Sequence, residues 1–577
     1  MSETLLVIPT AKLLPTELQA EFGALPSAMV PLNNQPALSY ILQIYQEWRP
    51  RTLIVVDEGR QSVQTYLARG EGGSAELCEA GGSRTLGETL LAALREASGA
   101  RHLVINFGDT LVWRRVRFQD TVVYAVRRES FRWTTFEIEG GKIEQLTDKQ
   151  HEKTYPLENK VFVGVFEIAA PQLFAELLQD AVADGQLSID PFYAALQRYV
   201  ARRTQDGFSV TFEQTKDWHD FGHLDTYYAT RRALSSGARE FNTIYIDARG
   251  GALAKRSRHT AKLRNEIRWY LNVPKNLQRF SPRLFDYSLD HDEPFVEMEY
   301  YGYPPLNDIY LHGAYGTGQW ELILGAIDFY LGEMHRYRYE PRGTGRGDEG
   351  GELRAALTDM YEHKTAQRLT PILEDARFAR FHDPLRVNGQ PVLGLRQVLA
   401  SLPAVAQAAG LYDLPFFTVL HGDLCLSNIL FDRHNGAVRV IDPRGDFGGF
   451  DVYGDFRYDL AKLSHSIHGD YDFYVNGLFD IEDGEDGEDG VVLRPYFGAH
   501  HASTKQLFER WLGARWPDRV AQIRLIESLL FLSMVPLHAD RFESQRAFLA
   551  RGLELYTREA VACGLAAHIL GEVQLAE

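Results

Sequence analysis

The clearest chemical signal in the sequence is HGDLCLSNILFD, which spans residues 421–432 and is followed shortly by VIDPRGD. Phosphoryl transfer from a nucleotide needs an acid that orients the acceptor hydroxyl, and an asparagine five residues later commonly binds the metal. Asp423 and Asn428 have this spacing. Asp442 directly follows the apolar run AVRVI, so a strand ending there would direct its carboxylate to the same ion. Because Mg²⁺ needs few protein oxygens, we expect Asp423 to be the catalytic acid and Asn428 and Asp442 to be metal ligands.

Such a reaction also needs a cation on the nucleotide phosphates, held by an acid on a nearby helix. Lys255, in GALAKRS, stands at the end of an expected strand, and Glu266 follows inside an expected helix. A lysine on a strand is most often a solvated edge residue, and Lys262 is a competing candidate. The position of Lys255 upstream of the Asp423 segment favours Lys255 as the phosphate-binding cation, with Glu266 as its partner.

The elements that must position these residues form a small strand-rich lobe and a larger helical lobe. IYID, a Gly-Gly turn and ALAK predict a hairpin after residue 239, and a helix is expected over 259–270. RLFDYSL and PFVEMEY predict two more strands. Beyond residue 306 the apolar spacing predicts helices. They are expected at residues 319–338, 353–368, 395–409, 505–512, 519–534 and 544–557.

Segments 421–432 and 441–445 resemble the aminoglycoside phosphotransferase/choline kinase family, small-molecule relatives of the protein kinases. The resemblance covers residue 239 onward and implies a bilobal protein-kinase-like (α+β) domain that uses ATP and Mg²⁺. It gives Asp423, Asn428, Asp442, Lys255 and Glu266 the roles stated above. It also implies a hinge beside the adenine in VEMEYY (296–301), with Glu297 and Met298 at the ATP site.

The same resemblance implies that Asp459, in YGDFRYDLAKL, braces the catalytic loop. No GxGxxG motif stands over the phosphates, and only ARGG (248–251) occupies that hairpin turn, as is common in this family. Residues that could bind the acceptor follow the metal site in the sequence, and the sequence does not show which of them do so. They are Arg444, His465, His468, His538 and Arg541.

The first part of the chain alternates short β-branched runs with helical patterns. TLLVI (4–8), TLIVV (52–56), HLVIN (102–106) and TVVYAV (121–126) predict buried strands, and helices are expected over 36–47 and 86–97. Strand–helix alternation predicts a mostly parallel, Rossmann-like α/β sheet with helices on both faces. Ligands of such sheets bind at the carboxyl ends of the strands.

Segments 25–42, 106–110 and 217–234 are similar to the sugar-phosphate and choline-phosphate nucleotidyltransferases, which have a GT-A-type sheet domain. The similarity implies that Asp109 and Asp220 hold Mg²⁺ and that Gly164 lies near the sugar site. CTP or another nucleoside triphosphate would be the nucleotide. The GxGxR loop of that family is missing, and Ser27 replaces the lysine expected after Pro26. Because catalysis of nucleotidyl transfer is chiefly cationic, a degenerate binding or scaffold domain is the alternative.

The composition limits the class of protein. The 577 residues are 45% hydrophobic and carry a net charge of −17, which is typical of a globular chain and disfavours general binding of nucleic acid. We expect domains at 1–234, 235–302 and 303–577, and solvated loops at 341–351 and 480–490. The three cysteines, Cys78, Cys425 and Cys563, have no disulfide or zinc spacing. No signal peptide or membrane insertion is expected, and the expected location is the cytoplasm.

Together these features predict a small-molecule kinase that transfers the γ-phosphate of ATP to a hydroxyl of a small polar acceptor, such as a sugar or an amino alcohol. The fused nucleotidyltransferase-like domain would then activate the product as an NDP- or CDP-linked donor for bacterial capsule or other surface polysaccharide. Three alternatives remain open. Only the kinase is active, the whole chain is a nucleotide-binding non-enzyme, or the kinase inactivates an aminoglycoside antibiotic.

Overall fold

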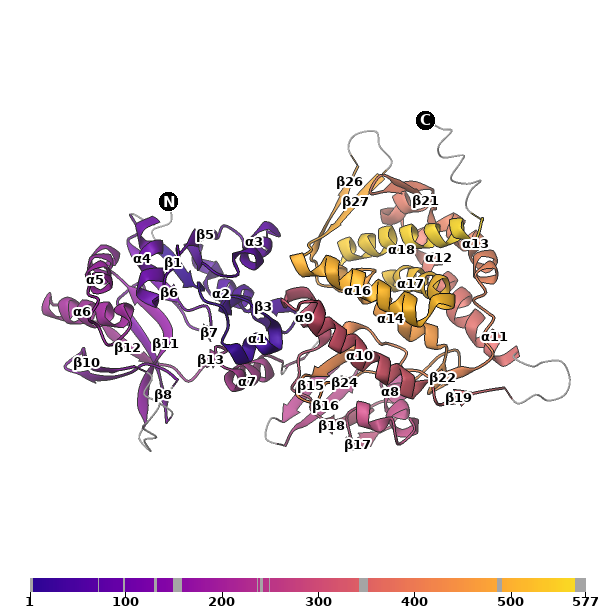
Figure 1. The fold of residues 1–577 in the computed structure, drawn as a ribbon, viewed down its shortest axis with the longest axis horizontal. Helices are drawn as coiled ribbons and strands as arrows, with labels where there is room; N and C mark the ends of the chain where they lie inside the picture. Colours follow the sequence, from indigo (N-terminus) through magenta and orange to yellow (C-terminus); the bar gives the residue numbers. More distant parts are fainter. Residues whose placement is uncertain are drawn as a thin grey trace. The chain divides into compact units, whose positions relative to one another are not determined.

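The computed structural model describes residues 4–70, 72–96, 99–128, 132–148, 158–235, 237–238, 242–247, 250–341, 351–484 and 490–565. The chain divides into two compact units (Figure 1). The first comprises Met1–Ser235 with His312–Ala314, and the second comprises Ser236–Leu311 with Tyr315–Glu577. Most of the two loops expected at 341–351 and 480–490 lies outside the described residues. The three cysteines are free.

Four parallel strands form one side of the sheet in the first unit, and every residue of each expected run lies in a strand. In sheet order they are β6 (His102–Asn106), β1 (Thr4–Pro9), β4 (Arg51–Val56) and β5 (Glu76–Glu79). Successive side chains of a strand point to opposite faces, and both Val7 and Ile8 are fully buried. Both faces of this sheet are therefore covered.

The sheet is mixed rather than mostly parallel. β11 (Asn159–Ile168) pairs antiparallel with β6, and the run at 121–126 joins β11 instead of extending the parallel series. The remaining strands are β8 (Thr121–Arg127), β9 (Thr135–Glu139), β10 (Lys142–Thr147) and β12 (Thr211–Gln214). β11 provides ten consecutive residues, eight of them buried, so its length lets it pair with β6, β8 and β9.

Three helices pack on one face of this sheet and share its hydrophobic core. They are α4 (Leu86–Glu96), α5 (Pro171–Ala183) and α6 (Pro191–Gln205). The other elements of the unit are α1 (Thr16–Phe22), η1 (Ser27–Met29), β2 (Pro31–Leu32), β3 (Gln35–Pro36), α2 (Ala37–Tyr45), η2 (Gln46–Trp48), α3 (Arg60–Ala68), β7 (Thr110–Val112), β13 (Trp218–Asp220) and α7 (Leu224–Ser235). Strands β7 and β13 pair with each other.

The second unit begins with the strand-rich lobe, a five-stranded antiparallel sheet that carries one long helix. The strand order is β14-β15-β16-β18-β17. The elements are β14 (Gly237–Ala238), β15 (Asn242–Asp247), β16 (Ala252–Ser257), α8 (Thr260–Asn272), η3 (Gln278–Phe280), β17 (Leu284–Ser288) and β18 (Phe295–Glu299). The expected hairpin is β15–β16, and the expected helix is α8.

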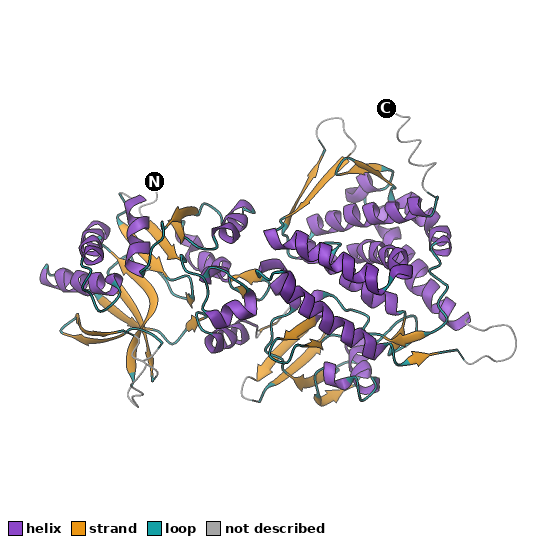
Figure 2. Ribbon diagram, viewed as in Figure 1, coloured by secondary structure: helices purple, strands orange, loops and turns teal. Residues whose placement is uncertain are grey.

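The helical lobe follows, and Figure 2 shows that helices make up most of it. Its helices are α9 (Leu306–His312), α10 (Thr317–Met334), α11 (Gly351–Thr358), α12 (Lys364–Glu374), α13 (Leu395–Ala408), α14 (Phe456–Ile467), α15 (Tyr471–Val475), α16 (Ala499–Arg515), α17 (Val520–Met534) and α18 (Phe542–Ala562). Shorter turns are η5 (Ala376–Phe381), η6 (Leu426–Asn428), η7 (Pro517–Arg519) and η8 (Val535–His538). Helices α14, α17 and α18 pack against one another in sequence.

Three small sheets complete the helical lobe. The two strands β23 (Ile429–Asp432) and β24 (Ala437–Val440) form a hairpin directly after the HGD segment. The other strands are β19 (Arg338–Tyr339), β22 (Phe417–Val419), β25 (Tyr453–Gly454), β20 (Leu385–Val387), β21 (Gln390–Val392), β26 (Phe479–Asp483) and β27 (Gly490–Pro495).

One expected helix, over residues 353–368, is interrupted by a π turn. The chain runs from α11 through the π turn η4 (Asp359–His363) into α12, which begins at Lys364. Single π turns of this kind inside a helix are frequent at functional sites. The periodicity of the sequence gave no sign of the interruption.

One segment, Pro517–His538, is long and apolar enough to cross a membrane by length and composition alone. In the structure 78% of that window is buried inside the unit, as is usual for a core helix. The expectation that the chain has no membrane-inserted segment is therefore not tested by the composition of this helix.

Candidate active site

The catalytic loop, residues 421–428, is held by the carboxylate of Asp459. The backbone N–H of His421 donates to Asp459 Oδ2 at 2.9 Å, and the N–H of Gly422 donates to Oδ1 at 2.8 Å. Gly422 has a φ of +79°, which a residue with a side chain rarely adopts. Asp459 lies on α14 and is 2% exposed. Two N–H groups that would otherwise be unpaired are thus satisfied by one buried acid.

Asp423, the expected catalytic acid, is fixed through both carboxylate oxygens. Lys462 Nζ lies 2.9 Å from Oδ1, and Asn428 Nδ2 donates to Oδ2 at 3.2 Å. Desolvation raises the pKa of Asp423, but the Lys462 ammonium outweighs this effect and holds the pKa well below its usual value. Asp423 is therefore ionised and ready to accept a hydrogen bond from a hydroxyl group.

Asn428 and Asp442 meet at the open end of the β23–β24 hairpin. Ile429 pairs with Val440, and the N–H of Ile441 donates to the carbonyl oxygen of Asn428 at 3.0 Å. Asp442 leaves the strand with a φ of +56°, a left-handed conformation that costs energy outside glycine. Because of this turn, the Asp442 side chain points away from the β23–β24 hairpin and toward Lys255 of the strand-rich lobe.

Lys255 joins the two lobes of the second unit. Its Nζ atom lies 2.9 Å from Glu266 Oε2 on α8 and 2.9 Å from Asp442 Oδ1. Lys255 and Glu266 are buried, whereas the Asp442 side chain is 49% exposed. The competing candidate, Lys262, is exposed on α8. The structure thus brings Lys255, Glu266 and Asp442 together.

The charges in this group act on one another. Burial lowers the pKa of Lys255, but Asp442 and Glu266 outweigh burial and raise it above its usual value. Burial raises the pKa of Glu266 to about 7, against the opposing effect of Lys255. Desolvation likewise raises the pKa of Asp442, and Lys255 overcomes it, so that the net pKa is lowered. The Lys255 ammonium therefore pairs with two carboxylates, of which Glu266 has a raised pKa and Asp442 a lowered one.

Gly445 sets the distance between the Asp442 loop and α8. Its φ is +62°, and a Cβ atom on it would lie 2.0 Å from the carbonyl oxygen of Asn265. Only glycine permits this approach. Because Asn265 immediately precedes Glu266, the contact places Glu266, the partner of Lys255, against the Asp442 loop.

The oxygen atoms at this place fit a magnesium ion. Asn428 uses its Nδ2 atom for hydrogen bonds to Asp423, so its Oδ1 atom is left for a cation. Asp442 uses Oδ1 for Lys255, which leaves Oδ2. Mg²⁺ is commonly bound through one or two protein oxygens plus phosphate and water. Among the described residues there is no group of three or more His, Cys, Asp or Glu side chains that would form a fully protein-ligated metal site.

The two residues expected beside the adenine lie on β18 rather than in the segment that follows it. Met298 is 4% exposed and pairs with Leu253 of β16, so its side chain belongs to the core of the strand-rich lobe. Glu297 pairs with Ala254 and is partly exposed. The chain leaves the sheet at Tyr300, whose N–H donates to the Gly251 carbonyl.

In the first unit, Asp109 and Asp220 lie side by side. The Phe221 N–H donates to the Asp109 carbonyl oxygen at 3.0 Å. Asp220 accepts hydrogen bonds from His223 Nδ1, at 3.1 Å, and from the Thr226 hydroxyl. The hydrogen bond that His223 donates to Asp220 is the largest cause of the raised pKa of His223, and the charge of Asp109 adds to it. Asp220, at the end of β13, is thus already engaged by residues at the start of α7.

Two other residues of this unit have structural roles. The Ser27 hydroxyl lies 3.3 Å from the Thr10 hydroxyl. The position expected for a lysine is therefore occupied by a serine that makes a local hydrogen bond. Gly164 has a φ of +86°, and a Cβ atom there would lie 2.8 Å from the Phe107 ring. Packing alone therefore requires this glycine. Lys12, the nearest substitute cation in the sequence, is exposed.

Lys462 is a site residue that the sequence interpretation missed. It lies on α14, one turn after Asp459, so the same helix face braces the catalytic loop and pairs with Asp423. A spacing of three residues between an acid and a lysine on one helix was the available signal. Of the residues considered for the acceptor, Arg444 borders the loop: its N–H donates to the His421 carbonyl.

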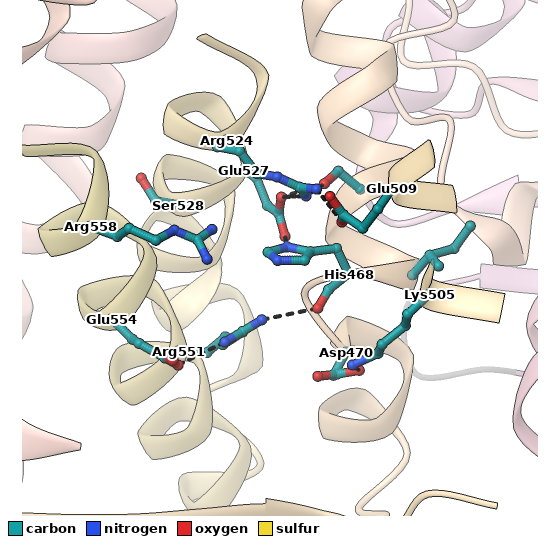
Figure 3. A network of polar contacts seen from close by, with 12 residues as sticks. His468, Asp470, Lys505, Glu509, Arg524, Glu527, Ser528, Arg551, Glu554 and Arg558 are labelled. Carbon is teal, nitrogen blue, oxygen red and sulfur yellow. Dashed lines mark hydrogen bonds and ion pairs between the residues drawn. The ribbon is translucent and has the colours of Figure 1, made fainter. Parts of the chain in front are cut away.

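The other four acceptor candidates have partners away from the catalytic loop. His465 is fully buried between the Tyr471 and Phe531 rings, and Arg541 donates to the Val475 carbonyl. His538 packs against Phe548. His468 lies 2.9 Å from Glu527 in the network of Figure 3, which anchors the end of α14.

Comparison with known proteins agrees with the second unit's geometry. Residues 230–488 match the model of the phosphotransferase enzyme family. No curated protein matches this sequence. The expected α/β sheet of the first half and the phosphotransferase-family domain of the second are therefore confirmed.

Among solved structures, CTP:phosphocholine cytidylyltransferase from Streptococcus pneumoniae is 13% identical, over 40% of this chain and 99% of that one, with a TM-score of 0.32. The inositol-1-phosphate CTP transferase from T. maritima is 12% identical, over 41% and 97%, with a TM-score of 0.30. The aminoglycoside phosphotransferase APH(4)-Ia, in complex with AMP-PNP and hygromycin B, is 12% identical, over 56% and 92%, with a TM-score of 0.34.

Proposed function

We propose that the phosphotransferase-family domain transfers the γ-phosphate of ATP to a hydroxyl group of a small polar acceptor. The observation that carries the proposal is the convergence of Asp423, Asn428, Asp442 and Lys255, which come from a loop, a hairpin and a strand of two lobes. A buried lysine bridging a helical glutamate and a half-exposed aspartate has the charge distribution that a triphosphate and a divalent cation need.

The reaction forms a bond between the acceptor oxygen and the γ-phosphorus and breaks the bond from that phosphorus to the β–γ bridging oxygen. ADP leaves, and the hydroxyl proton passes to the Asp423 carboxylate. Lys255 binds the nucleotide phosphates, while Asn428 and Asp442 hold Mg²⁺. The ion, when bound, neutralises the charge that develops on the phosphate oxygens.

Asp423 acts mainly by orientation in this scheme. Its pKa is held well below the usual range, so it is a weak base toward a free alcohol. It accepts the proton late, when the oxygen is already bonding to phosphorus and has become acidic. This timing suits a loose transition state in which the nucleophile needs little activation.

The test is ATP-dependent phosphorylation of a panel of sugars, amino alcohols and polyols, read as ADP release and as transferred phosphate. Asp423→Ala is expected to abolish both signals. Asp518→Asn, which changes an exposed aspartate far along the helical lobe, is the matched control and retains activity. Full turnover by Asp423→Ala overturns the proposal.

For the first unit we propose binding of a nucleoside triphosphate, such as CTP, beside Asp109 and Asp220. The adjacency of these two acids supports metal–phosphate binding. The absence of a cation at Ser27 favours binding over nucleotidyl transfer. If transfer does occur, the kinase product becomes an NDP- or CDP-linked donor for surface polysaccharide, made in the cytoplasm.

This second proposal is tested by thermal-shift titration with CTP, ATP, GTP and UTP in the presence of Mg²⁺. A ligand at 100 times its Kd stabilises a fold by about 2.7 kcal/mol. A shift that survives Asp442→Ala but is lost in Asp109→Asn supports a nucleotide site in the first unit. No shift in an Asp442→Ala background overturns it. Pyrophosphate release from CTP and a phosphorylated acceptor decides between binding and transfer.

A further inference from the structure

Four cations gather on the helical-lobe side of the catalytic loop. Lys364 and Arg368 lie one turn apart on α12, Arg444 lies after β24, and Lys462 lies on α14. Lys462 borders the loop through its ion pair with Asp423. The backbone N–H of Arg444 donates to the His421 carbonyl, and the Arg444 side chain lies against Gly422. None of the four comes from the strand-rich lobe that carries Lys255. The group is called the α12–α14 cation cluster below.

A buried tyrosine contacts Arg444 within this cluster. Tyr458 is buried on α14, and its hydroxyl accepts a hydrogen bond from Arg444 Nη1 at 2.9 Å. The Arg444 guanidinium also lies over the Tyr458 ring, 5.9 Å from its centre. Lys364 lies near enough to Arg444, Arg368 and Lys462 for their charges to lower its pKa, so the four side chains share one neighbourhood beside the loop of residues 421–428.

The positive charge of this cluster is poorly compensated. Lys462 is paired with Asp423, but among the residues that the structure describes, Lys364, Arg368 and Arg444 have no carboxylate within ion-pair distance. Arg368 donates to the Ser533 carbonyl and Arg444 to Tyr458, which are both neutral acceptors. Asp446, an exposed acid, is the carboxylate that interacts with Lys364 at longer range.

The pKa of Lys364 reflects the same excess of positive charge. Its pKa is lowered to about 6, chiefly by burial and further by the charges of Arg444, Arg368 and Lys462. Burial likewise lowers the pKa of Arg368, and Arg444 adds to it. With a pKa of about 6, Lys364 is mostly uncharged at neutral pH in the free protein, and an anion bound beside it would favour its protonated form. Arginine stays charged in proteins, so a bound anion is stabilised by Arg368 and Arg444 and by the proton that Lys364 gains.

The position of Lys364 in its helix supports a binding role. It is the first residue after the π turn η4, where the helix widens. Tyr361 of that turn donates to Asp455, the N-terminal cap of α14. The π turn thus fixes α12 against the helix that carries Tyr458 and Lys462, and holds Lys364 toward them.

We propose that Lys364, Arg368 and Arg444 bind an anionic group of the phosphoryl acceptor, so that the acceptor is a hydroxyl compound carrying a phosphate or a carboxylate. This inference rests on the proposed kinase function. It narrows the acceptor from sugars and amino alcohols in general to anionic ones, such as sugar phosphates or sugar acids. Amino alcohols and aminoglycosides, which are cationic, are repelled by the cluster. Lys462 keeps its ion pair with Asp423, which receives the acceptor's hydroxyl.

The first arm of the test compares acceptors of three charge classes in the ADP-release assay. Glucose 6-phosphate, glycerol 3-phosphate and gluconate represent the anions, glucose and glycerol the neutral compounds, and choline and kanamycin the cations. The inference expects at least one anion to stimulate ADP release at least 10-fold more than any neutral or cationic compound. The phosphate and gluconate arms distinguish the two anionic groups. Stimulation confined to neutral or cationic acceptors overturns the inference and leaves the kinase function intact.

The second arm measures binding and does not depend on turnover. Glucose 6-phosphate and gluconate are titrated calorimetrically into the full chain with the nucleotide site filled by Mg²⁺ and AMP-PNP. Lys364→Gln is expected to raise the Kd of the bound anion at least 10-fold, and Lys364→Arg is expected to keep it within about 3-fold. Arg510→Gln, which removes an exposed cation of α16, is the charge-matched control. Equal affinity in the wild type and in Lys364→Gln overturns the inference.

Thermal unfolding separates a binding site from a structural cluster. Lys364 is mostly uncharged at neutral pH, and its replacement by glutamine breaks none of the ion pairs among the described residues, so Lys364→Gln is expected to unfold at the same temperature as the wild type or at a higher one. Arg368→Gln provides a second variant with the same expectation. Loss of anion binding together with retained or increased stability supports the inference. A lowered melting temperature with unchanged anion affinity overturns it.

Discussion

Lys462 Nζ lies 2.9 Å from Asp423 Oδ1, so the expected catalytic acid is paired with a cation from a helix rather than standing alone on its loop. The same helix contributes Asp459, which holds the loop backbone. Position and charge of Asp423 are therefore both set by α14. A substitution in α14 is therefore expected to alter catalysis even where it does not contact the nucleotide.

Lys462→Met is expected to lower kcat/KM by about 10²-fold, because it removes a cation beside the developing phosphate charge. The pH dependence of kcat/KM is a more specific test of this role than the size of the rate loss. Lys462 holds the pKa of Asp423 well below its usual value, so the wild-type rate falls only at low pH. Without Lys462 the pKa of Asp423 rises and the acidic limb of the kcat/KM profile moves to higher pH. Lys462→Arg keeps the charge and is expected to keep the limb in place, whereas an unmoved limb in Lys462→Met contradicts the assignment.

Gly445→Ala is expected to reduce both stability and activity. The φ of +62° and the 2.0 Å approach of a Cβ atom to the Asn265 carbonyl require the Asp442 loop to move away from α8. Gly436→Ala is the matched control, since Gly436 has a φ of +61° and a Cβ atom there has nothing within 4 Å. The control is expected to lose about 1–2 kcal/mol from the left-handed backbone alone.

Urea unfolding of the two glycine variants isolates the crowding at Gly445 as the difference between them. Gly445→Ala is expected to lose more free energy of unfolding than the control and to raise the KM for ATP, because Glu266 and Lys255 shift with the loop. Equal losses in both variants, with unchanged KM, would show that the loop and α8 are not coupled.

Asp459→Asn tests the bracing of the catalytic loop. The carboxylate accepts from two backbone N–H groups, and an amide supplies only one oxygen, so one buried N–H is left unpaired. The expected cost is about 1–3 kcal/mol in the free energy of unfolding, together with a lower kcat. Equilibrium unfolding in urea and steady-state kinetics measure the two effects. A variant with wild-type stability and kcat would remove Asp459 from the loop's support.

Local sequence signals were sufficient for the hairpin and for the Asp423, Asn428 and Asp442 set, because spacing within one loop and hairpin determines their geometry. The Lys255–Glu266 pair could also be expected, since a strand and the helix after it pack together. The three-residue spacing from Asp459 places Lys462 on the same helix face, but it does not single out Lys462, because a lysine on a helix has the same sequence pattern whether it faces water or an acid. Its role depends on how α14 packs, which is a tertiary property.

The mixed sheet and the π turn were missed for related reasons. The run at 121–126 has the composition of any buried strand, and only its pairing with β11 shows that it belongs to the antiparallel part. Residues 353–368 keep a helical apolar spacing through the extra turn at Asp359–His363. Strand partners and helix insertions are decided by contacts far apart in the sequence, which periodicity does not contain.

Glu527 provides a prediction on stability against pH. It is fully buried on α17 and accepts from His468, Ser464 and Arg524, the last at 2.7 Å (Figure 3). Burial raises its pKa, but His468 and Arg524 outweigh burial and hold the pKa well below the ordinary value of 4.5. Because the folded-state pKa is depressed, the stability from Glu527 is present above pH 4.5 and is lost as the pH falls toward the folded-state pKa.

Glu527→Gln is therefore expected to lose about 3–5 kcal/mol at pH 7, since Arg524 is left with less compensation inside the lobe. The difference from the wild type should shrink steadily between pH 5 and pH 3, where the wild type loses the same interaction. Guanidinium unfolding at a series of pH values measures it. Glu543→Gln, which alters an exposed ion pair with Arg546, should differ from the wild type by less than about 0.5 kcal/mol at every pH. A Glu527→Gln deficit that stays constant down to pH 3 would mean that the lost stability comes from packing and not from the carboxylate charge.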